Sequence, residues 1–378
     1  MTYDVLIVGA SPSGLKASIE VSREGLNVGL VEKRSFDGGG EGRPSPDTSF
    51  YGFFDHLGLD VDEEYVAHKL EGMKLISPAG NEIKVNTRGF SFFREDFDRY
   101  YLNKAEEHDV DLLLGKNVVS VSRNEVRTED GSRYEGDLVI FACGSRSDIL
   151  EELNISTMKY PSDLAEAVQA EVSGLSFDSN YFHYFLGKKY APGWKATISP
   201  KGEDFGSVGV FVRNVDPDKY FDKFFEEVIG EEVKVKEVST GEDQIITIPN
   251  KLVDDGIMVV GGAAGQAGIP FSMKAAEICS KVGSRAVKES KTSRSDLIEY
   301  ERRWKKGYNK YYKFARFFLR KMEDIEDDGL DDIISSLGGI NFAGEIRKHN
   351  NLYLNALGVM LELITKKPTN VRLIKYLI

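Results

Sequence analysis

YDVLIVGASPSGLKASIEVSREGLNVGLVE, residues 3–32, is the stretch that decides the fold. The apolar run 3–8 predicts a strand, a glycine-containing turn follows at 9–14, and residues 15–23 predict a helix. A second apolar strand then ends at Glu32. This order of strand, tight turn, helix and strand with a terminal acid predicts the first half of a dinucleotide-binding fold.

Each part of the turn has a physical role in such a fold. Gly9 allows the sharp turn off the strand, and Gly14 allows the helix to pack close to the sheet. Ser11 stands where the middle glycine of the pattern is usual, and free backbone N–H groups at the helix start face a pyrophosphate. Glu32 can accept hydrogen bonds from both hydroxyls of an adenosine ribose. The alternative interpretation is an ordinary strand, turn and helix without a ligand.

Composition narrows the function classes. The chain has 378 residues, of which 41% are hydrophobic, so it can bury a sizeable core as two domains or one elaborate domain. A net charge of −12 argues against nucleic acid as the main partner, because phosphate neutralisation needs a basic face. Two cysteines favour a reducing cytoplasm. We expect no signal peptide, because the first strand begins at residue 3, and no apolar run has the length of a membrane span.

The order of the remaining segments indicates a dinucleotide fold with an insertion. A glycine- and proline-rich connection covers 34–49, and long connections of this kind are usually functional. A buried strand is predicted at 137–142 and another at 256–261. Between them, residues 161–250 alternate aromatic and polar side chains with turn signals, which predicts an antiparallel sheet. From about residue 293 the chain is charged and helical.

Several motifs, taken in this order, are similar to those of the FAD-dependent geranylgeranyl reductase family, a branch of the flavoproteins with the p-hydroxybenzoate hydroxylase fold. The resemblance covers nearly the whole chain. The motifs are the turn at 9–14, Gly40-Glu41-Gly42, Arg94-Glu95-Asp96-Phe97-Asp98, the stretch 181–210 with its Pro200-Lys201-Gly202-Glu203, Gly261 to Gly265, and Tyr300-Glu301-Arg302.

The resemblance implies an α/β fold: a Rossmann-like FAD-binding domain, split by an antiparallel β-sheet substrate domain, with a C-terminal helical region. The boundaries that we expect are 1–70, 94–160 and 251–292 for the FAD-binding parts, 71–93 for a β insertion that contributes to the substrate domain, 161–250 for that domain, and 293–378 for the helical region.

The resemblance also implies an FAD-dependent oxidoreductase that reduces double bonds of an isoprenoid (geranylgeranyl) lipid, by hydride transfer from reduced flavin. An apolar tunnel is expected over the inserted sheet. An external electron donor, either a small reductant or a protein carrier, is expected because no second dinucleotide fold is visible. The implied location is cytoplasmic, with possible peripheral membrane contact. The alternatives are a flavin monooxygenase of the same fold and a non-catalytic paralogue that binds isoprenoid or FAD.

The family's contact residues transfer onto this sequence position by position, and no metal site is implied. No catalytic residue can be assigned. Tyr181, His183 and Trp194 are candidates for substrate contact. The positions that the resemblance assigns to FAD are Gly9, Ser11, Pro12, Ser13, Gly14, Glu32, Lys33, Gly39, Gly42, Arg94, Val118, Gly262, Ala263, Ala275 and Ala276.

The sequence also departs from the family pattern. Gly262 stands where the family has an aspartate that binds the flavin side chain, and Gly39 stands where it has a cysteine. The family's aromatic signature falls on Lys195, Thr197 and Ser199, before the shared Pro200.

A glycine-rich turn of the family is replaced by Phe271-Ser272-Met273-Lys274-Ala275. Lys274 there can face the flavin, where its charge would favour the reduced anion, or it can face water as an ordinary helix-start lysine. Residues 351–364 form an apolar run followed by Lys366 and Lys367, which predicts either a core-packing helix or an interfacial amphipathic helix.

Overall fold

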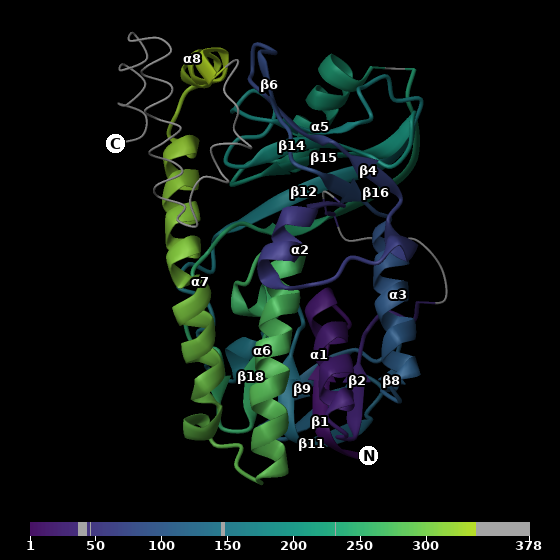
Figure 1. Cartoon of the computed structure of the whole chain (residues 1–378), viewed down its shortest axis with the longest axis vertical. Helices are drawn as coiled ribbons and strands as arrows, with labels where there is room; N and C mark the ends of the chain where they lie inside the picture. Colours follow the sequence, from purple (N-terminus) through teal and green to yellow (C-terminus); the bar gives the residue numbers. More distant parts are fainter. Residues whose placement is uncertain (37–43, 46, 145–147, 231, 338–378) are drawn as a thin grey trace.

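The computed structural model of the chain describes residues 1–36, 44–45, 47–144, 148–230 and 232–337. Two large sheets lie at opposite ends of the molecule, and one long helix runs beside both (Figure 1). The lower part contains the N-terminal strand and the helices packed on it. The upper part contains the strands from the inserted region. This arrangement confirms the predicted fold class.

The lower sheet is built on five parallel strands in the order β18-β11-β1-β2-β8. Both β1 and the end of β11 are buried and apolar, as expected for parallel strands covered on two faces. Antiparallel strands complete the sheet. Its members are β1 (Thr2–Val8), β2 (Val28–Val31), β8 (Asp111–Leu113), β9 (Val118–Val121), β10 (Glu125–Thr128), β11 (Arg133–Phe141), β17 (Val253–Asp254) and β18 (Ile257–Val259).

Four helices lie side by side over this unit in the order α3, α1, α6 and α7 (Figure 1). Their bounds are Pro12–Arg23 for α1, Arg94–Glu107 for α3, Ile269–Lys288 for α6 and Arg294–Glu323 for α7. The other helical segments are short, and they are α2 (Tyr51–Leu57), η1 (Glu63–Tyr65), α4 (Asp148–Glu152), α5 (Pro217–Phe224), η2 (Phe225–Ile229), η3 (Gly261–Ala264) and α8 (Asp327–Leu337). No helix among the described residues is long and apolar enough to span a membrane.

The upper sheet has seven strands in the order β16-β12-β15-β14-β13-β5-β6. The strands of residues 161–250 pair antiparallel with one another, as predicted, and the one parallel pair of this sheet joins β13 to β5 of the earlier insertion. The strands are β5 (Gly72–Ile76), β6 (Glu82–Val85), β12 (Leu164–Ser173), β13 (Tyr181–Phe185), β14 (Lys195–Pro200), β15 (Phe205–Val212) and β16 (Lys234–Gln244).

A small third sheet lies between the two large ones. It consists of β3 (Thr48–Phe50), β7 (Gly89–Ser91) and β4 (His68–Leu70), with β7 in the centre. The sequence placed residues 90–93 with the strands that became β5 and β6, whereas β7 pairs with β3 and β4 instead. The Ser91 hydroxyl donates a hydrogen bond to the Pro200 carbonyl, which ties this small sheet to the upper one.

Alternation along the upper strands gives its sheet two different faces. Val168, Ala196, Ile198 and Val210 belong to an apolar cluster that also contains Phe224 of α5, and this is the outer face. The inner face is turned toward the small sheet, because the Ser199 hydroxyl is hydrogen-bonded to the Thr48 hydroxyl. The outer face is therefore a closed core, and only the inner face looks toward the dinucleotide unit.

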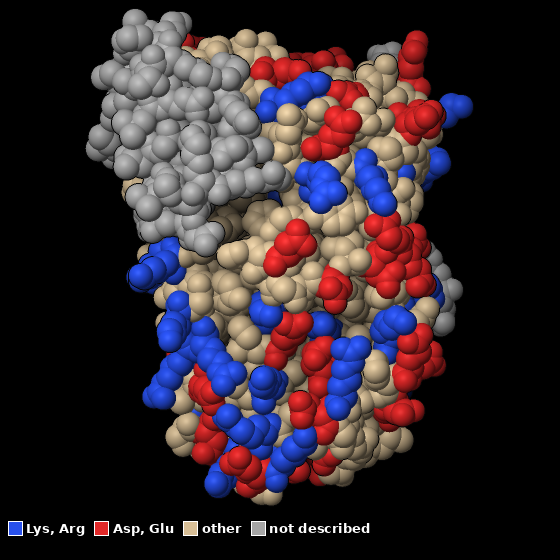
Figure 2. All heavy atoms as spheres, viewed as in Figure 1, with Lys and Arg blue, Asp and Glu red and all other residues tan. Residues whose placement is uncertain are grey.

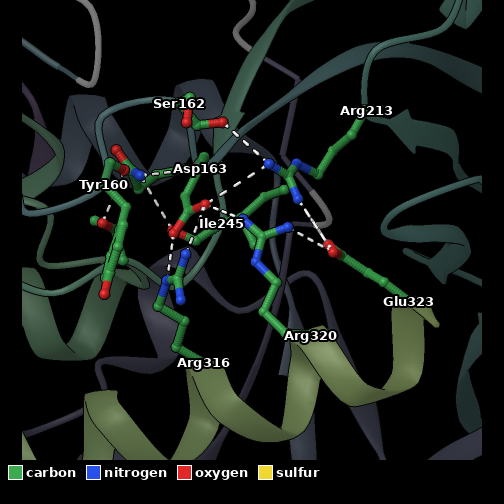
Figure 3. Close-up of polar contacts among 10 residues, drawn as sticks. Tyr160, Ser162, Asp163, Arg213, Ile245, Arg316, Arg320 and Glu323 are labelled. Carbon is green, nitrogen blue, oxygen red and sulfur yellow. Dashed lines mark hydrogen bonds and ion pairs between the residues drawn. The ribbon is translucent and has the colours of Figure 1, made fainter.

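An ionic cluster fixes α7 to the start of β12. The Asp163 carboxylate, almost fully buried, receives Arg316 Nε at 2.7 Å, and it also pairs with Arg213 and Arg320. Glu323 of α7 pairs with Arg213 at 2.9 Å and with Arg320 at 2.5 Å. Figure 3 shows the three guanidinium groups directed at Asp163 from α7 below and from the upper strands. The cluster therefore joins the long helix of the lower unit to the upper sheet.

Candidate functional site

The N-terminal turn at residues 9–14, which we call the cradle, packs so closely against neighbouring backbone that two of its positions have no room for a side chain. Gly9 has φ +102°, and a Cβ there would lie 2.7 Å from the Ala142 carbonyl oxygen. A Cβ on Gly14 would lie 1.9 Å from the Gly9 carbonyl oxygen. Ser11 caps α1, because its Oγ accepts a hydrogen bond from Gly14 N at 3.3 Å. Glycine at both positions therefore allows the turn to pack against the end of β11 and the start of α1 to pack against the turn, as in dinucleotide folds, where the helix N-terminus faces a pyrophosphate.

Glu32 is buried at the carboxyl end of β2, beside this cradle. Its Oε2 accepts a hydrogen bond from Ala10 N at 2.5 Å, and its Oε1 accepts one from Arg34 N at 3.0 Å. Val118, at the start of β9, lies on the same side, since Lys116 N donates to the Glu32 carbonyl at 2.8 Å. The assignment of Glu32 and Val118 to FAD stays a prediction.

Arg34 is a site residue that sequence reasoning missed. Its Nε lies 3.1 Å from Glu32 Oε1, its Nη1 lies 3.0 Å from Asp98 Oδ2, and its Nη2 donates to the Ala10 carbonyl at 3.0 Å. Lys33, which the resemblance assigned to FAD, is exposed. The available signal was an arginine two residues after Glu32, the acid at the end of the strand.

Arg94 lies where the sequence placed it, at the start of α3. Its Nε lies 2.9 Å from Asp98 Oδ1, so Asp98 holds both Arg94 and Arg34. Two fixed guanidinium groups beside the cradle suit a dinucleotide diphosphate, because charge-assisted hydrogen bonds need cations already in place. The cradle, the buried acid and these cations therefore fit FAD. Gly39 and Gly42 lie outside the described residues.

The turn that follows β18 closes the cradle from the other side. A Cβ on Gly261 would lie 2.2 Å from Ser13 Oγ, so this turn abuts the N-terminal one. Gln266 fixes it, since Gln266 Oε1 accepts from Gly261 N at 2.8 Å and its amide donates to Tyr300 OH at 2.9 Å. Gly262 supplies no side chain.

Further residues assigned to FAD lie in the core around that turn. Ala263 is 1% exposed, and Ala275 and Ala276 of α6 have no exposed surface.

The residues that replace the glycine-rich turn face α7. The Phe271 ring stacks on Tyr311, with centroids 5.0 Å apart and an interplanar angle of 22°. The ring centroid of Phe53, in α2, lies 6.0 Å from that of Phe271. Lys274 Nζ pairs with Glu277 one turn later at 2.8 Å. This pairing is what an ordinary helix-surface lysine would show.

Tyr181 and His183 lie on the outer face of the upper sheet. His183 pairs in register with Ile198, whose side chain belongs to the outer apolar cluster. The His183 ring packs on Phe177 and its Nε2 bonds to the Asp178 carbonyl at 2.9 Å, and burial lowers its pKa. The structure therefore does not bring these two predicted substrate residues to the inner face.

The inner face carries polar residues where the family has aromatic ones. Tyr184 pairs in register with Thr197, so both lie on the face that also carries Lys195 and Ser199. Lys195 Nζ lies 3.2 Å from Asp243 Oδ2, with 9% of the lysine side chain exposed. Burial lowers the pKa of Lys195, against the opposing effect of Asp243. A buried ammonium with a lowered pKa is a proton donor of useful strength.

Aromatic rings surround that ammonium. Its Nζ lies 4.8 Å from the Trp194 ring centroid and 4.7 Å from that of Phe211. Trp194 also packs against the inner-face cluster, which consists of Ala165, Ala167, Phe211 and Ile245. Of the three predicted substrate residues, Trp194 is therefore the one that lies at the inner face. Burial and the charge of Asp243 raise the pKa of Tyr184, so its hydroxyl stays protonated.

A polar cavity of about 360 Å³ opens between the inner face and the start of α3. At its wall, Lys201 Nζ lies 2.9 Å from Asp47 Oδ2 and 2.5 Å from Glu171 Oε1, and the lysine side chain is 1% exposed. Burial raises the pKa of Asp47 and of Glu171, against the effect of Lys201. Arg94 also lines this cavity. Most residues that line this cavity are polar or charged, and the elongated apolar tunnel expected from the resemblance stays a prediction.

Comparison with known proteins agrees with this geometry. Residues 4–142 match the family described as FAD dependent oxidoreductase. Together with the cradle and the fold, this match defines the class of the protein as a flavin-dependent oxidoreductase.

Full-length similarity is more specific. The chain is 28% identical over 398 residues to the digeranylgeranylglycerophospholipid reductase of Methanocaldococcus jannaschii, covering 99% of this chain and 97% of the relative. It is 28% identical to digeranylgeranylglycerophospholipid reductase 2 of Methanothermobacter thermautotrophicus, covering 90% and 92%. The crystal structure of a geranylgeranyl bacteriochlorophyll reductase-like protein from Thermoplasma acidophilum has a TM-score of 0.83 at 20% identity and covers 100% of this chain and 99% of its own. The resemblance to the geranylgeranyl reductase family is thus confirmed.

Proposed function

We propose that this chain is an FAD-dependent reductase that saturates double bonds in the isoprenoid chains of a glycerophospholipid. The observation that carries the proposal is similarity over 99% of the chain to a digeranylgeranylglycerophospholipid reductase. The bound FAD supplies a hydride when it is reduced. Everything else in the proposal concerns what the residues of this chain do.

The lower unit holds the cofactor. Gly9 and Gly14 allow β1, the turn and α1 to pack closely, and the pyrophosphate binds at the start of α1, where the free N–H groups and the helix dipole favour negative charge. Glu32 accepts hydrogen bonds from the adenosine ribose, which requires its carboxylate to exchange the Ala10 amide for ribose hydroxyls. Arg34 and Arg94 neutralise phosphate charge from their position on Asp98.

The upper sheet supplies the proton. Reduction of an alkene adds a hydride to one carbon and a proton to the other, so the site needs a proton donor as well as the flavin. Lys195 is positioned for this role, because its ammonium is buried on the inner face and its lowered pKa eases proton release. Asp243 orients the ammonium and offers a path by which Lys195 is protonated again from solvent.

Electron supply and location complete the proposal. An external donor, either a small reductant or a protein carrier, reduces the flavin between turnovers. The protein acts in the cytoplasm and meets its lipid substrate at the membrane surface. Residues 71–93 and 161–250 act as the substrate-binding part, and residues 1–70, 94–160 and 251–292 as the FAD-binding part.

The test uses purified full-length chain loaded with FAD. Anaerobic photoreduction is followed by mixing with a geranylgeranyl-containing phospholipid in detergent. Return of the oxidised-flavin absorbance, together with a saturated product in the mass spectrum, supports the reductase. A second sample of the reduced protein is mixed with the lipid and oxygenated buffer, and a hydroxylated product there would point to a monooxygenase instead. Failure to retain FAD would point to a non-catalytic paralogue.

A further inference from the structure

The exposed side of α7 carries a line of cations that nothing described so far uses. Its exposed residues include Arg302, Lys306, Lys310, Lys313 and Phe317, spaced four, four, three and four residues apart. Residues at these spacings lie on one face of a helix, and the line extends for roughly 22 Å at 1.5 Å per residue. We define these five residues as the basic stripe. Figure 2 shows Lys and Arg gathered along the edge of the molecule over α7.

The cations of the stripe have no ionic partner within the described part of the chain. The described ion pairs of α7 lie away from the stripe: Arg303 contacts Glu299, Lys305 contacts Glu301, and the Asp163 cluster holds Arg316 and Arg320. Arg302, Lys306, Lys310 and Lys313 take part in none of the described ion pairs. Four exposed like charges in a row repel one another, so an unpartnered stripe is unfavourable unless an anionic surface meets it.

The charge of α7 is opposite to that of the whole molecule. Residues 294–323 contain ten Lys and Arg and four Asp and Glu, whereas the chain carries a net charge of −12. Such local reversal orients a protein toward a negative surface, while the rest of the molecule is repelled from it. Nucleic acid is a poor partner for this surface. A duplex that wraps or bends around α7 would come close to the acidic remainder of the molecule, which would repel its phosphates.

Two exposed rings lie at the end of the stripe. Phe317 is 53% exposed and Phe318 is 45% exposed, whereas the opposite side of α7 buries Trp304 and Tyr312 completely or nearly so. Aromatic rings beside cations are what an interfacial helix uses, because the rings enter the acyl boundary while the cations meet the lipid headgroups. An acidic protein partner would need only the cations for binding, whereas the exposed rings favour a lipid bilayer.

The rings also lie next to the proposed reaction site. Leu319, one residue beyond Phe318, packs against the inner-face cluster of Ala165, Ala167, Phe211 and Ile245. Phe211 is the ring over which Lys195 Nζ lies at 4.7 Å. The end of the stripe that carries the apolar rings is therefore the end nearest to the inner face, where a lipid chain would have to arrive.

We propose that the basic stripe, with Phe318, is the surface by which this protein binds an anionic lipid bilayer, so that isoprenoid chains pass from the membrane toward the inner face of the upper sheet. This inference rests on the proposed function only for the identity of the lipid that is reduced. Binding to the bilayer itself follows from the charge, the exposure and the aromatic pair of α7.

The experiment is vesicle co-sedimentation of the full-length chain. One set of vesicles is phosphatidylcholine alone, and the other contains phosphatidylglycerol. We expect binding to the anionic set only, and weakening by added salt. The triple variant Lys306→Glu, Lys310→Glu, Lys313→Glu should bind at least about tenfold more weakly. The matched control is Lys219→Glu, Lys234→Glu, Lys281→Glu, which changes the net charge equally at exposed lysines on other elements and should bind as the parent does.

A second variant tests the rings. Phe317→Ser with Phe318→Ser should weaken binding without changing its salt dependence, whereas charge reversal should abolish that dependence. Equal binding of neutral and anionic vesicles, or equal loss in the stripe and control triples, would overturn the proposal. So would unchanged vesicle binding of the stripe triple, an outcome that would assign the stripe to an acidic protein.

Measuring lipid reduction beside vesicle binding distinguishes failure of the membrane surface from failure of the proposed function. A chain that reduces detergent-dispersed lipid but binds no vesicles refutes the membrane surface alone. A chain that binds anionic vesicles through the stripe but reduces no lipid refutes the reductase and leaves the surface in place. Far-ultraviolet circular dichroism of each variant establishes that it is folded.

Discussion

Lys195 Nζ lies 3.2 Å from Asp243 Oδ2 on the inner face of the upper sheet, where the geranylgeranyl reductase family carries an aromatic residue. Two strands distant in sequence bring the pair together, since Lys195 begins β14 and Asp243 lies near the end of β16. The pair is the proton donor that we propose, and the sequence alone did not reveal it. It also replaces part of the apolar wall that the resemblance implied.

Replacing Lys195 tests its role as the proton source. Lys195→Met keeps the side-chain length but removes the ammonium, so we expect lipid reduction to slow by about 10²–10⁴-fold, the usual contribution of a general acid. FAD affinity and flavin reduction should be unchanged, because they depend on the lower unit. Lys104→Met on the surface of α3 is the control. A Lys195→Met protein with parental turnover would remove Lys195 from the mechanism.

The pH dependence of stability gives a second test of the same lysine. Burial lowers the folded-state pKa of Lys195 below its ordinary value of 10.5. The folded chain therefore binds this proton less well than the unfolded chain, and below the folded pKa the fold bears the full penalty of the charge. As pH rises from the folded-state pKa toward 10.5, that penalty disappears. The contribution of Lys195 to the free energy of unfolding therefore increases, and the protein becomes more stable.

The measurement is urea unfolding of the parent and of Lys195→Met across that pH range. The difference between the two free energies of unfolding should change with pH in the direction given, since all other groups titrate alike in both proteins. A difference that does not vary with pH would mean that the Lys195 ammonium is well solvated in the fold. Turnover should fall through the same window, because the donor must be protonated.

Glu32→Ala tests the cofactor site. Loss of the carboxylate removes the ribose contact and also releases Arg34 and the Ala10 amide, which Glu32 holds in the ligand-free protein. We expect FAD affinity to weaken by about 1–3 kcal/mol, measured by fluorescence titration of the apoprotein. Glu24→Ala, at an exposed position after α1, is the control. Parental affinity in Glu32→Ala would place the ribose elsewhere.

Lys201→Met tests the ionic wall of the polar cavity. Removal of the only ammonium in contact with Asp47 and Glu171 in the described structure leaves the buried Asp47 carboxylate without its ion-pair partner, which should destabilise the fold by about 3–5 kcal/mol. Because burial already raises the pKa of both carboxyls, they take up protons readily as pH falls, and the loss should shrink at acid pH.

Denaturant unfolding at neutral and acid pH measures that loss. Lys236→Met, an exposed lysine over the Phe205 ring, provides the comparison and should cost little. A loss in Lys201→Met that stays constant as pH falls would show that lost packing, and not unpaired charge, accounts for it.

Local patterns made the lower unit predictable. Residues 3–32 combine apolar periodicity, glycines that are required by close backbone packing, and an acid at the end of the second strand. The structure has β1, α1 and β2 at those positions. The close approach at Gly14 is to the Gly9 carbonyl of this same segment, whereas the one at Gly9 is to Ala142, directly after the distant strand β11. Arg34 was missed because its partner Asp98 lies 64 residues away.

Pairing between distant strands limited prediction in the upper sheet. Alternation of apolar and polar residues along a strand indicates two faces, but it does not say which face meets the dinucleotide unit. For this reason the sequence could not show that Tyr181 and His183 lie on the outer face. The parallel pairing of β5 with β13 joins residues more than 100 positions apart, beyond any local pattern. Lys195 and Asp243 likewise meet only through the order β16-β12-β15-β14 in the folded sheet.

The most direct test of the central claim is a single anaerobic turnover. FAD-loaded chain is photoreduced, mixed with a phospholipid that carries geranylgeranyl chains, and followed by flavin absorbance while the lipid is analysed by mass spectrometry. We predict that the oxidised-flavin band returns as the lipid gains two hydrogens per double bond, and that Lys195→Met slows both events together. A reduced flavin that persists in the presence of the lipid, with the lipid mass unchanged, would contradict the account.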